Sequence, residues 1–187
     1  MEPEYAFTAE ELARIAEIRR RYPTARAALM SVLWMAQEKF GWLSRAVIEL
    51  VAQTLGLSPA EVYGVATFYT MYHTQACGRY VLDLCTCLSC QVLGAEDLLR
   101  HLEERLGARD GQTTPDGLFT VRHTECLGAC GSGPVLMINN RRYVHRLSRE
   151  RLDQLIEELR QGRMPEFESI PLPERPWEQG ASSDSHR

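Results

Sequence analysis

The sequence predicts an α+β fold in which an N-terminal helical bundle precedes a mixed α/β domain. Apolar residues recur at helical spacing through residues 1–76, and a helix-start signal precedes most of these runs. From residue 79 the pattern changes to strand, helix, strand, hairpin and helix. We therefore expect a helical domain over residues 1–76, an α/β domain over residues 77–163 and an extended tail over residues 164–187.

Each helix of the first domain has a recognisable start or end. Residues 8–11 have the form of a capping box, and the helix that they open should end near Pro23. Gly41 should end the second helix, and a third should run between a serine cap at 44 and Gly56. Residues 58–61 combine a serine cap, a proline at the first helical position and a glutamate, so they should begin a fourth helix.

The second domain alternates between strands and helices. We expect strands over residues 79–85 and 118–124, with a helix over 94–106 between them. Residues 135–145 read as a hairpin with an Asn-Asn turn, and residues 148–162 as a final helix. A helical crossover makes the first two strands parallel, and both helices can cover one face of the sheet. This is the connectivity of a thioredoxin-like domain.

Bulk composition excludes several classes of function. The 187 residues include 44% hydrophobic and 25% charged residues, as in an ordinary globular protein, and the net charge of −4 gives no basis for nucleic-acid binding. The N-terminus lacks the pattern of a signal peptide, and the nearly apolar stretch 27–36 is too short to span a bilayer. We expect no direct membrane span and a cytoplasmic location, where six cysteines favour metal or redox chemistry over disulfides.

Four cysteines follow the two parallel strands in pairs. Cys85 and Cys90 follow the first strand, and Cys126 and Cys130 follow the second. Because the carboxyl ends of neighbouring parallel strands lie side by side, the two loops should meet. Four thiolates around one point are what a [2Fe–2S] cluster requires, and glycines in the second loop let backbone N–H groups approach the sulfurs.

Two other interpretations of the cysteines stay open at this point. The spacing within each pair is at or near the upper limit for structural zinc sites, so zinc is an alternative. Cys87 and Cys90 also form a Cys-x-x-Cys pair, which a thiol–disulfide enzyme would use. That interpretation leaves Cys126 and Cys130 without a role.

Several motifs in order resemble one family, the thioredoxin-like [2Fe–2S] subunit of NADH:quinone oxidoreductase, respiratory complex I. They are Glu-Val-Tyr-Gly-Val-Ala-Thr-Phe-Tyr at 61–69, Thr-Pro-Asp-Gly-Leu-Phe at 114–119, and Glu-Cys-Leu-Gly-Ala-Cys at 125–130 with Gly-Pro at 133–134. The resemblance covers roughly residues 8–163. It implies that Cys85, Cys90, Cys126 and Cys130 are the cluster ligands, and Cys87 departs from the usual pattern of the family.

The resemblance also implies an electron-transfer role in a larger complex. In the family, NADH reduces FMN on a partner flavoprotein subunit, and the cluster of the small subunit lies near that flavin. The chain would then sit among peripheral-arm subunits at the inner membrane and belong to an enzyme, with no catalytic residue or NADH or FMN site of its own. A soluble NAD(P)-linked hydrogenase or formate dehydrogenase uses a similar subunit, which is the alternative.

Overall fold

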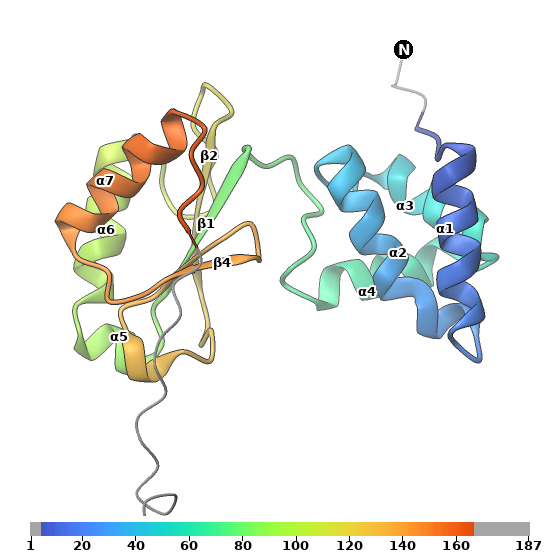
Figure 1. Ribbon diagram of the computed structural model, residues 1–187, viewed down its shortest axis with the longest axis horizontal. Coiled ribbons are helices and arrows are strands. Elements are labelled where there is room, and N and C mark those ends of the chain that lie inside the picture. The colour runs from blue at the N-terminus through green and yellow to red at the C-terminus, as the bar shows by residue number, and fades with distance from the viewer. Residues whose placement is uncertain (1–4, 167–187) are drawn as a thin grey trace, which may run out of the picture.

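The computed structural model describes residues 5–166, which form a helical half and a half built on a β-sheet (Figure 1). The helical half contains α1 (Ala9–Arg20), α2 (Ala25–Phe40), α3 (Arg45–Leu55) and α4 (Pro59–Phe68). The second half contains β1 (Tyr80–Cys85), α5 (Leu88–Val92), α6 (Ala95–Leu106), β2 (Phe119–Thr124), the 3-10 helix η1 (Cys130–Ser132), β3 (Leu136–Ile138), β4 (Arg142–Val144) and α7 (Arg149–Arg160). The predicted α+β class is confirmed.

Local capping contacts explain where the helices begin and end. Thr8 and Ser58 each accept a hydrogen bond from the third residue of the helix, whose glutamate side chain returns the bond, as the predicted capping boxes require. Gly56 takes a left-handed backbone (φ +67°) where α3 ends. α1 ends at Arg20, close to the predicted end near Pro23, whose ring disfavours helical backbone in the residue before it.

The helical half has an apolar core of its own. Buried side chains from α1 to α4 meet there, together with residues from the adjoining loops. The most deeply buried are Leu29, Val32, Leu33, Ala36, Leu43, Val47, Val51, Ala52, Val62 and Ala66. Leu29, Val32, Leu33 and Ala36 of α2 recur at helical spacing, as expected for a helix with one face in the core.

The sheet has four strands in the order β2-β1-β3-β4. β1 and β2 are parallel, with Tyr80 opposite Phe119 and Cys85 opposite Thr124. β3 pairs antiparallel with both β1 and β4. The predicted parallel pair and antiparallel hairpin are confirmed, and β1 is an interior strand whose six residues are all buried.

Helices α6 and α7 lie together on one face of the sheet (Figure 1). The second apolar core fills the space between them and the strands. Its most deeply buried members are Leu82, Leu84, Leu102, Phe119, Val121, Leu136, Ile138, Val144, Leu152, Leu155 and Leu159. Every second residue of β1 belongs to this core, as expected for a strand with one face against helices.

Two short elements were absent from the sequence prediction. α5 has five residues and η1 has three, which is too short for a helical period to be visible in a sequence. The hairpin turn was predicted correctly: Asn139 and Asn140 have φ values of +50° and +54°, the positive pair that a tight hairpin of this twist needs.

The two large apolar cores of the described residues lie one on each side of the connection between α4 and β1, and a small third cluster surrounds Cys85 and Cys90. The division at residues 76 and 77 remains a prediction. The predicted tail begins at Met164, and from residue 167 it lies outside the described residues. Among residues 5–166, no helix combines the length and apolar character needed to cross a membrane.

Polar contacts join the two halves through the segment between α4 and β1. Gln37 on α2 donates to the Met71 carbonyl at 2.9 Å and accepts from the His73 amide at 2.6 Å. Asn140 in the hairpin turn donates to the same Met71 carbonyl at 3.1 Å. The connecting segment is therefore bonded to the helices on one side and to the sheet on the other.

Candidate metal centre

The strand register brings the four predicted ligands to one end of the sheet. Cys85 is the last residue of β1 and lies opposite Thr124, the last residue of β2. Cys126 follows two residues later, and Cys90 lies in α5 just beyond β1. Cys130 begins η1 on the second loop. Two cysteines from each loop therefore gather at the carboxyl end of the parallel pair.

Cys126 and Cys130 form an exposed pair. Their sulfurs lie 3.3 Å apart, and the Gly128 amide donates to the Cys126 sulfur at 3.4 Å. The Gly128 bond, followed by the contact with Cys130, lowers the pKa of Cys126. The hydrogen bond with the Cys126 sulfur, followed by the repulsion between two thiolates so close, raises the pKa of Cys130. A bound cation would remove that repulsion.

Cys85 and Cys90 form a buried pair, each with only 2% of its surface exposed. The Cys85 amide donates to the Val135 carbonyl at 3.0 Å, which fixes the end of β1. Burial, and then the neighbouring Cys85 thiol, raise the pKa of Cys90 to about 11. The charge of Cys130 acts in the same direction, so the buried pair lies within electrostatic reach of the exposed pair.

The donor set fits a two-iron cluster in kind and in pairing. A [2Fe–2S] cluster takes four thiolates, two on each iron. The thiols stand here as two interacting pairs. Among residues 5–166, no three Cys, His, Asp or Glu side chains are arranged as a group that could hold a single metal ion.

Packing around the thiols supports the two loops. A Cβ atom added at Gly133 would come within 3.2 Å of both the Cys90 sulfur and a Leu93 methyl, so the second loop is pressed against the first. The Tyr143 hydroxyl of β4 donates to the Leu127 carbonyl at 3.2 Å. The first contact holds the two cysteine loops together, and the second fixes the loop of the exposed pair to the sheet.

The remaining two cysteines differ in position. Cys87 precedes α5 and packs, half-buried, against the small apolar cluster that contains Cys85 and Cys90. Cys77 lies in the connection between the two halves, where its thiol is 3.7 Å from the Gly41 carbonyl. Cys77 is therefore separate from the thiol group.

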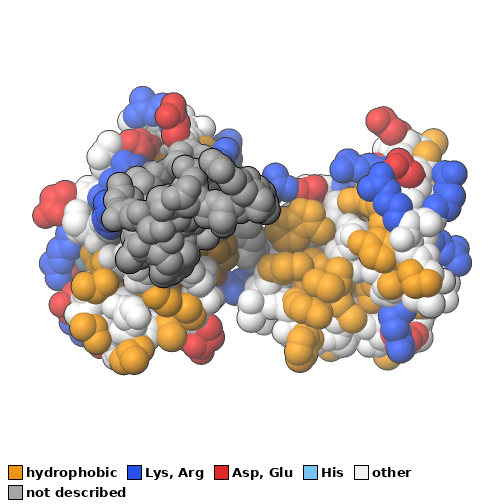
Figure 2. All heavy atoms as spheres, turned by 60° about the horizontal axis from the view of Figure 1, so that its bottom comes forward, with side chains coloured by type: hydrophobic (Ala, Val, Ile, Leu, Met, Phe, Trp, Pro, Cys, Tyr) orange, Lys and Arg blue, Asp and Glu red, His pale blue; other side chains and the backbone are white. Residues whose placement is uncertain are grey.

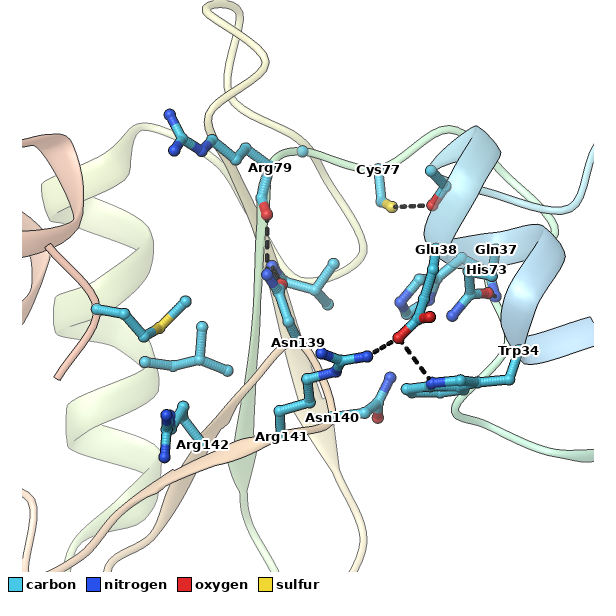
Figure 3. Close-up of a pocket in the computed structure, with 15 residues that line it drawn as sticks. Trp34, Gln37, Glu38, His73, Cys77, Arg79, Asn139, Asn140, Arg141 and Arg142 are labelled. Carbon is cyan, nitrogen blue, oxygen red and sulfur yellow. Dashed lines mark hydrogen bonds and ion pairs between the residues drawn. The ribbon is translucent and has the colours of Figure 1, made fainter. Parts of the chain in front are cut away.

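A hollow of about 770 Å³ lies between the two halves (Figure 3). Arg141 in the hairpin turn reaches across it to form an ion pair with Glu38, and its guanidinium lies over the Trp34 ring. Cys77 is the one cysteine that lines this hollow within the described part of the chain. The hollow is thus a feature of the junction and not of the metal centre.

Apolar side chains lie at the surface beside the thiols. Leu88, Val92 and Leu93, in and just after α5, are 73%, 78% and 55% exposed. On the helical half, Phe68 is 76% exposed and Tyr63 is 55% exposed. Figure 2, which brings the lower end of Figure 1 forward, shows hydrophobic side chains exposed on both halves. Such surface commonly marks a site of protein association.

A buried charged pair near the thiols was not predicted from the sequence. Asp83 on β1 is 2% exposed, and Arg122 on β2 lies opposite it, with Nε 3.0 Å from a carboxylate oxygen. The Arg122 guanidinium also contacts His73. An aspartate within an otherwise apolar strand was the available signal, because a buried charge requires a partner.

Comparison with known proteins identifies relatives over most of the chain. The family model described as thioredoxin-like [2Fe-2S] ferredoxin matches residues 15–160. An NADH-quinone oxidoreductase subunit of Rhizobium meliloti is 49% identical over 140 residues, which are 75% of this chain and 83% of that protein. NADH-quinone oxidoreductase subunit 2 of Thermus thermophilus is 43% identical over 155 residues, which are 82% of this chain and 84% of that protein.

Among solved structures, an NAD+-reducing [NiFe]-hydrogenase in the H2-reduced state is similar, with a TM-score of 0.65 and 28% identity. The match covers 77% of this chain but only 24% of the hydrogenase chain. The similarity therefore concerns one segment of a longer polypeptide.

Proposed function

Because the chain belongs to the thioredoxin-like [2Fe–2S] ferredoxin family, we propose that Cys85, Cys90, Cys126 and Cys130 hold one [2Fe–2S] cluster and that the chain is an electron-transfer subunit of an NADH:quinone oxidoreductase. The observation that carries this proposal is the meeting of two cysteine pairs at the end of β1 and β2. Dithiol chemistry at Cys87 and Cys90 would leave Cys126 and Cys130 without a role, and the family match favours a cluster over zinc.

The chain's own residues would bind and orient the cluster. When bound, the cluster supplies a centre that accepts and returns one electron at a time. The buried pair would anchor it to the interior of the sheet half, and the exposed pair would leave one side near the surface. The Gly128 amide, 3.4 Å from the Cys126 sulfur, would stabilise negative charge on that thiolate.

The partner that we propose is a flavoprotein subunit that carries FMN and oxidises NADH. The exposed thiols and the apolar residues of α5 offer a surface on which such a subunit could bring its flavin close. Other peripheral-arm subunits would complete the assembly beside the inner membrane, on the cytoplasmic side. Substrate chemistry would then belong to the flavoprotein, and this chain would act as part of the enzyme.

A hydrogenase or formate dehydrogenase module is the second candidate. The likeness to an NAD+-reducing hydrogenase supports it, but the higher sequence identity lies with the NADH-quinone oxidoreductase subunits. The two candidates share the same cluster and the same kind of flavoprotein partner. They differ in the final electron acceptor.

Reconstitution tests the electron-transfer role. The holo chain would be mixed anaerobically with the flavoprotein subunit from the same source, NADH would be added, and the reduced-cluster EPR signal recorded. We expect the signal to appear only when both proteins are present. A cluster that stays oxidised with the flavoprotein, although dithionite reduces it, would contradict this role.

A further inference from the structure

Asp83 carries a buried negative charge beside the proposed cluster. It lies on β1 two residues before Cys85, and both point away from the face that packs against α6 and α7. Two residues of a strand span about 7 Å. The carboxylate is 2% exposed, and neither oxygen has a hydrogen-bond partner among the described residues.

Arg122 compensates this charge. It lies opposite Asp83 in the strand register, and its Nε is 3.0 Å from the carboxylate. A buried carboxylate without hydrogen bonds depends on such a partner to stay ionised.

Two further contacts fix the guanidinium in place. Its Nη1 donates to His73 Nδ1 at 3.1 Å, and its Nη2 donates to the Thr70 carbonyl at 3.2 Å. Burial, and then the Arg122 charge, lower the pKa of His73 to about 4, so the imidazole is neutral at pH 7. His73 therefore positions Arg122 without adding a charge.

We propose that the Asp83–Arg122 pair sets the reduction potential of the cluster, an inference that rests on the function proposed above. Reduction adds one negative charge to the cluster. The negative charge of Asp83 disfavours reduction, and the positive charge of Arg122 favours it. Buried charges are only weakly screened by solvent ions. The balance between the two then determines how readily this chain accepts an electron from its partner.

The test is an EPR-monitored redox titration of the anaerobically purified holo chain. Asp83→Asn should raise the midpoint potential by on the order of tenfold in the reduction equilibrium, or about 59 mV for one electron. Arg122→Gln should lower it by no more than this, because an Asp83 left without Arg122 takes up a proton and loses its opposing charge. The double variant should return close to the wild-type value. Arg122→Lys should also stay near wild type, because it keeps the charge while losing the fork that bonds His73 and Thr70.

Arg160→Gln is the matched control, since Arg160 lies over the Phe119 ring at the opposite end of β2. The midpoint potential of the cluster in Arg160→Gln should equal that of the wild type. Equal potentials in wild type, Asp83→Asn and Arg122→Gln would overturn the inference while leaving the cluster intact, as would shifts of the two single variants in the same direction. A wild-type chain without a cluster signal would overturn the proposed function and this inference together.

Discussion

Cys85 lies directly opposite Thr124 in the parallel register of β1 and β2. This pairing determines where the thiols meet, because Cys126 follows Thr124 by two residues and Cys90 follows Cys85 by one short loop. A shift of the register would carry Cys126 along the strand and away from Cys85. The geometry of the metal centre thus depends on the sheet as much as on the spacing of the cysteines.

Serine substitution should identify the cluster ligands. Cys126→Ser and Cys130→Ser should each abolish or strongly alter the EPR signal, because each removes a thiolate from the proposed set. Cys77→Ser is the control, since Cys77 lies in the connection between the halves. If Cys77→Ser or Cys87→Ser removed the signal while Cys126→Ser kept it, the ligand set would be wrong.

Gly78→Ala should destabilise the sheet half. A Cβ at Gly78 would lie 2.8 Å from the Phe119 carbonyl carbon, so backbone must move, at a cost of about 1–3 kcal/mol. Gly64→Ala is the matched control in α4, where no atom lies within 4 Å and alanine should add roughly 0.5–1 kcal/mol of stability. Thermal unfolding of both variants measures the difference. Equal melting temperatures for the two would contradict the packing described for Gly78.

The elements with long apolar periods could be predicted from the sequence, and so could the two cysteine pairs. The helix caps at Thr8 and Ser58 and the turn at Asn139 and Asn140 are local features, so local sequence was sufficient. The Asp83–Arg122 pair was missed because the two residues are far apart in sequence, and only the sheet register brings them together. α5 was missed because it is shorter than two helical turns.

Gln37→Leu should weaken the junction between the halves. The amide side chain accepts from the His73 backbone N–H, and leucine would leave that partly buried donor without a partner, at a cost of about 1–3 kcal/mol. Gln53→Leu on the exposed face of α3 is the control and should change stability little. Chemical denaturation compares the two. A Gln37→Leu protein that unfolds at the wild-type denaturant concentration would show that the bond contributes nothing.

His73 should make stability fall at mildly acidic pH. Burial and the Arg122 charge lower its pKa to about 4, whereas an unfolded histidine titrates near 6.5. As pH falls from about 6.5 toward 4, the unfolded state takes up a proton that the folded state does not, so stability is lost over that range. His73→Gln, which keeps an acceptor for Arg122, should show a shallower loss between pH 7 and pH 5. Parallel pH profiles for wild type and variant would refute this role.

Metal analysis decides whether the four cysteines hold a [2Fe–2S] cluster. The chain would be purified anaerobically, its iron, zinc and acid-labile sulfide measured, and its EPR spectrum recorded at low temperature after dithionite reduction. We expect two irons and two sulfides per chain and the signal of a reduced [2Fe–2S] cluster. A colourless protein that contains one zinc ion per chain and gives no signal would contradict this expectation.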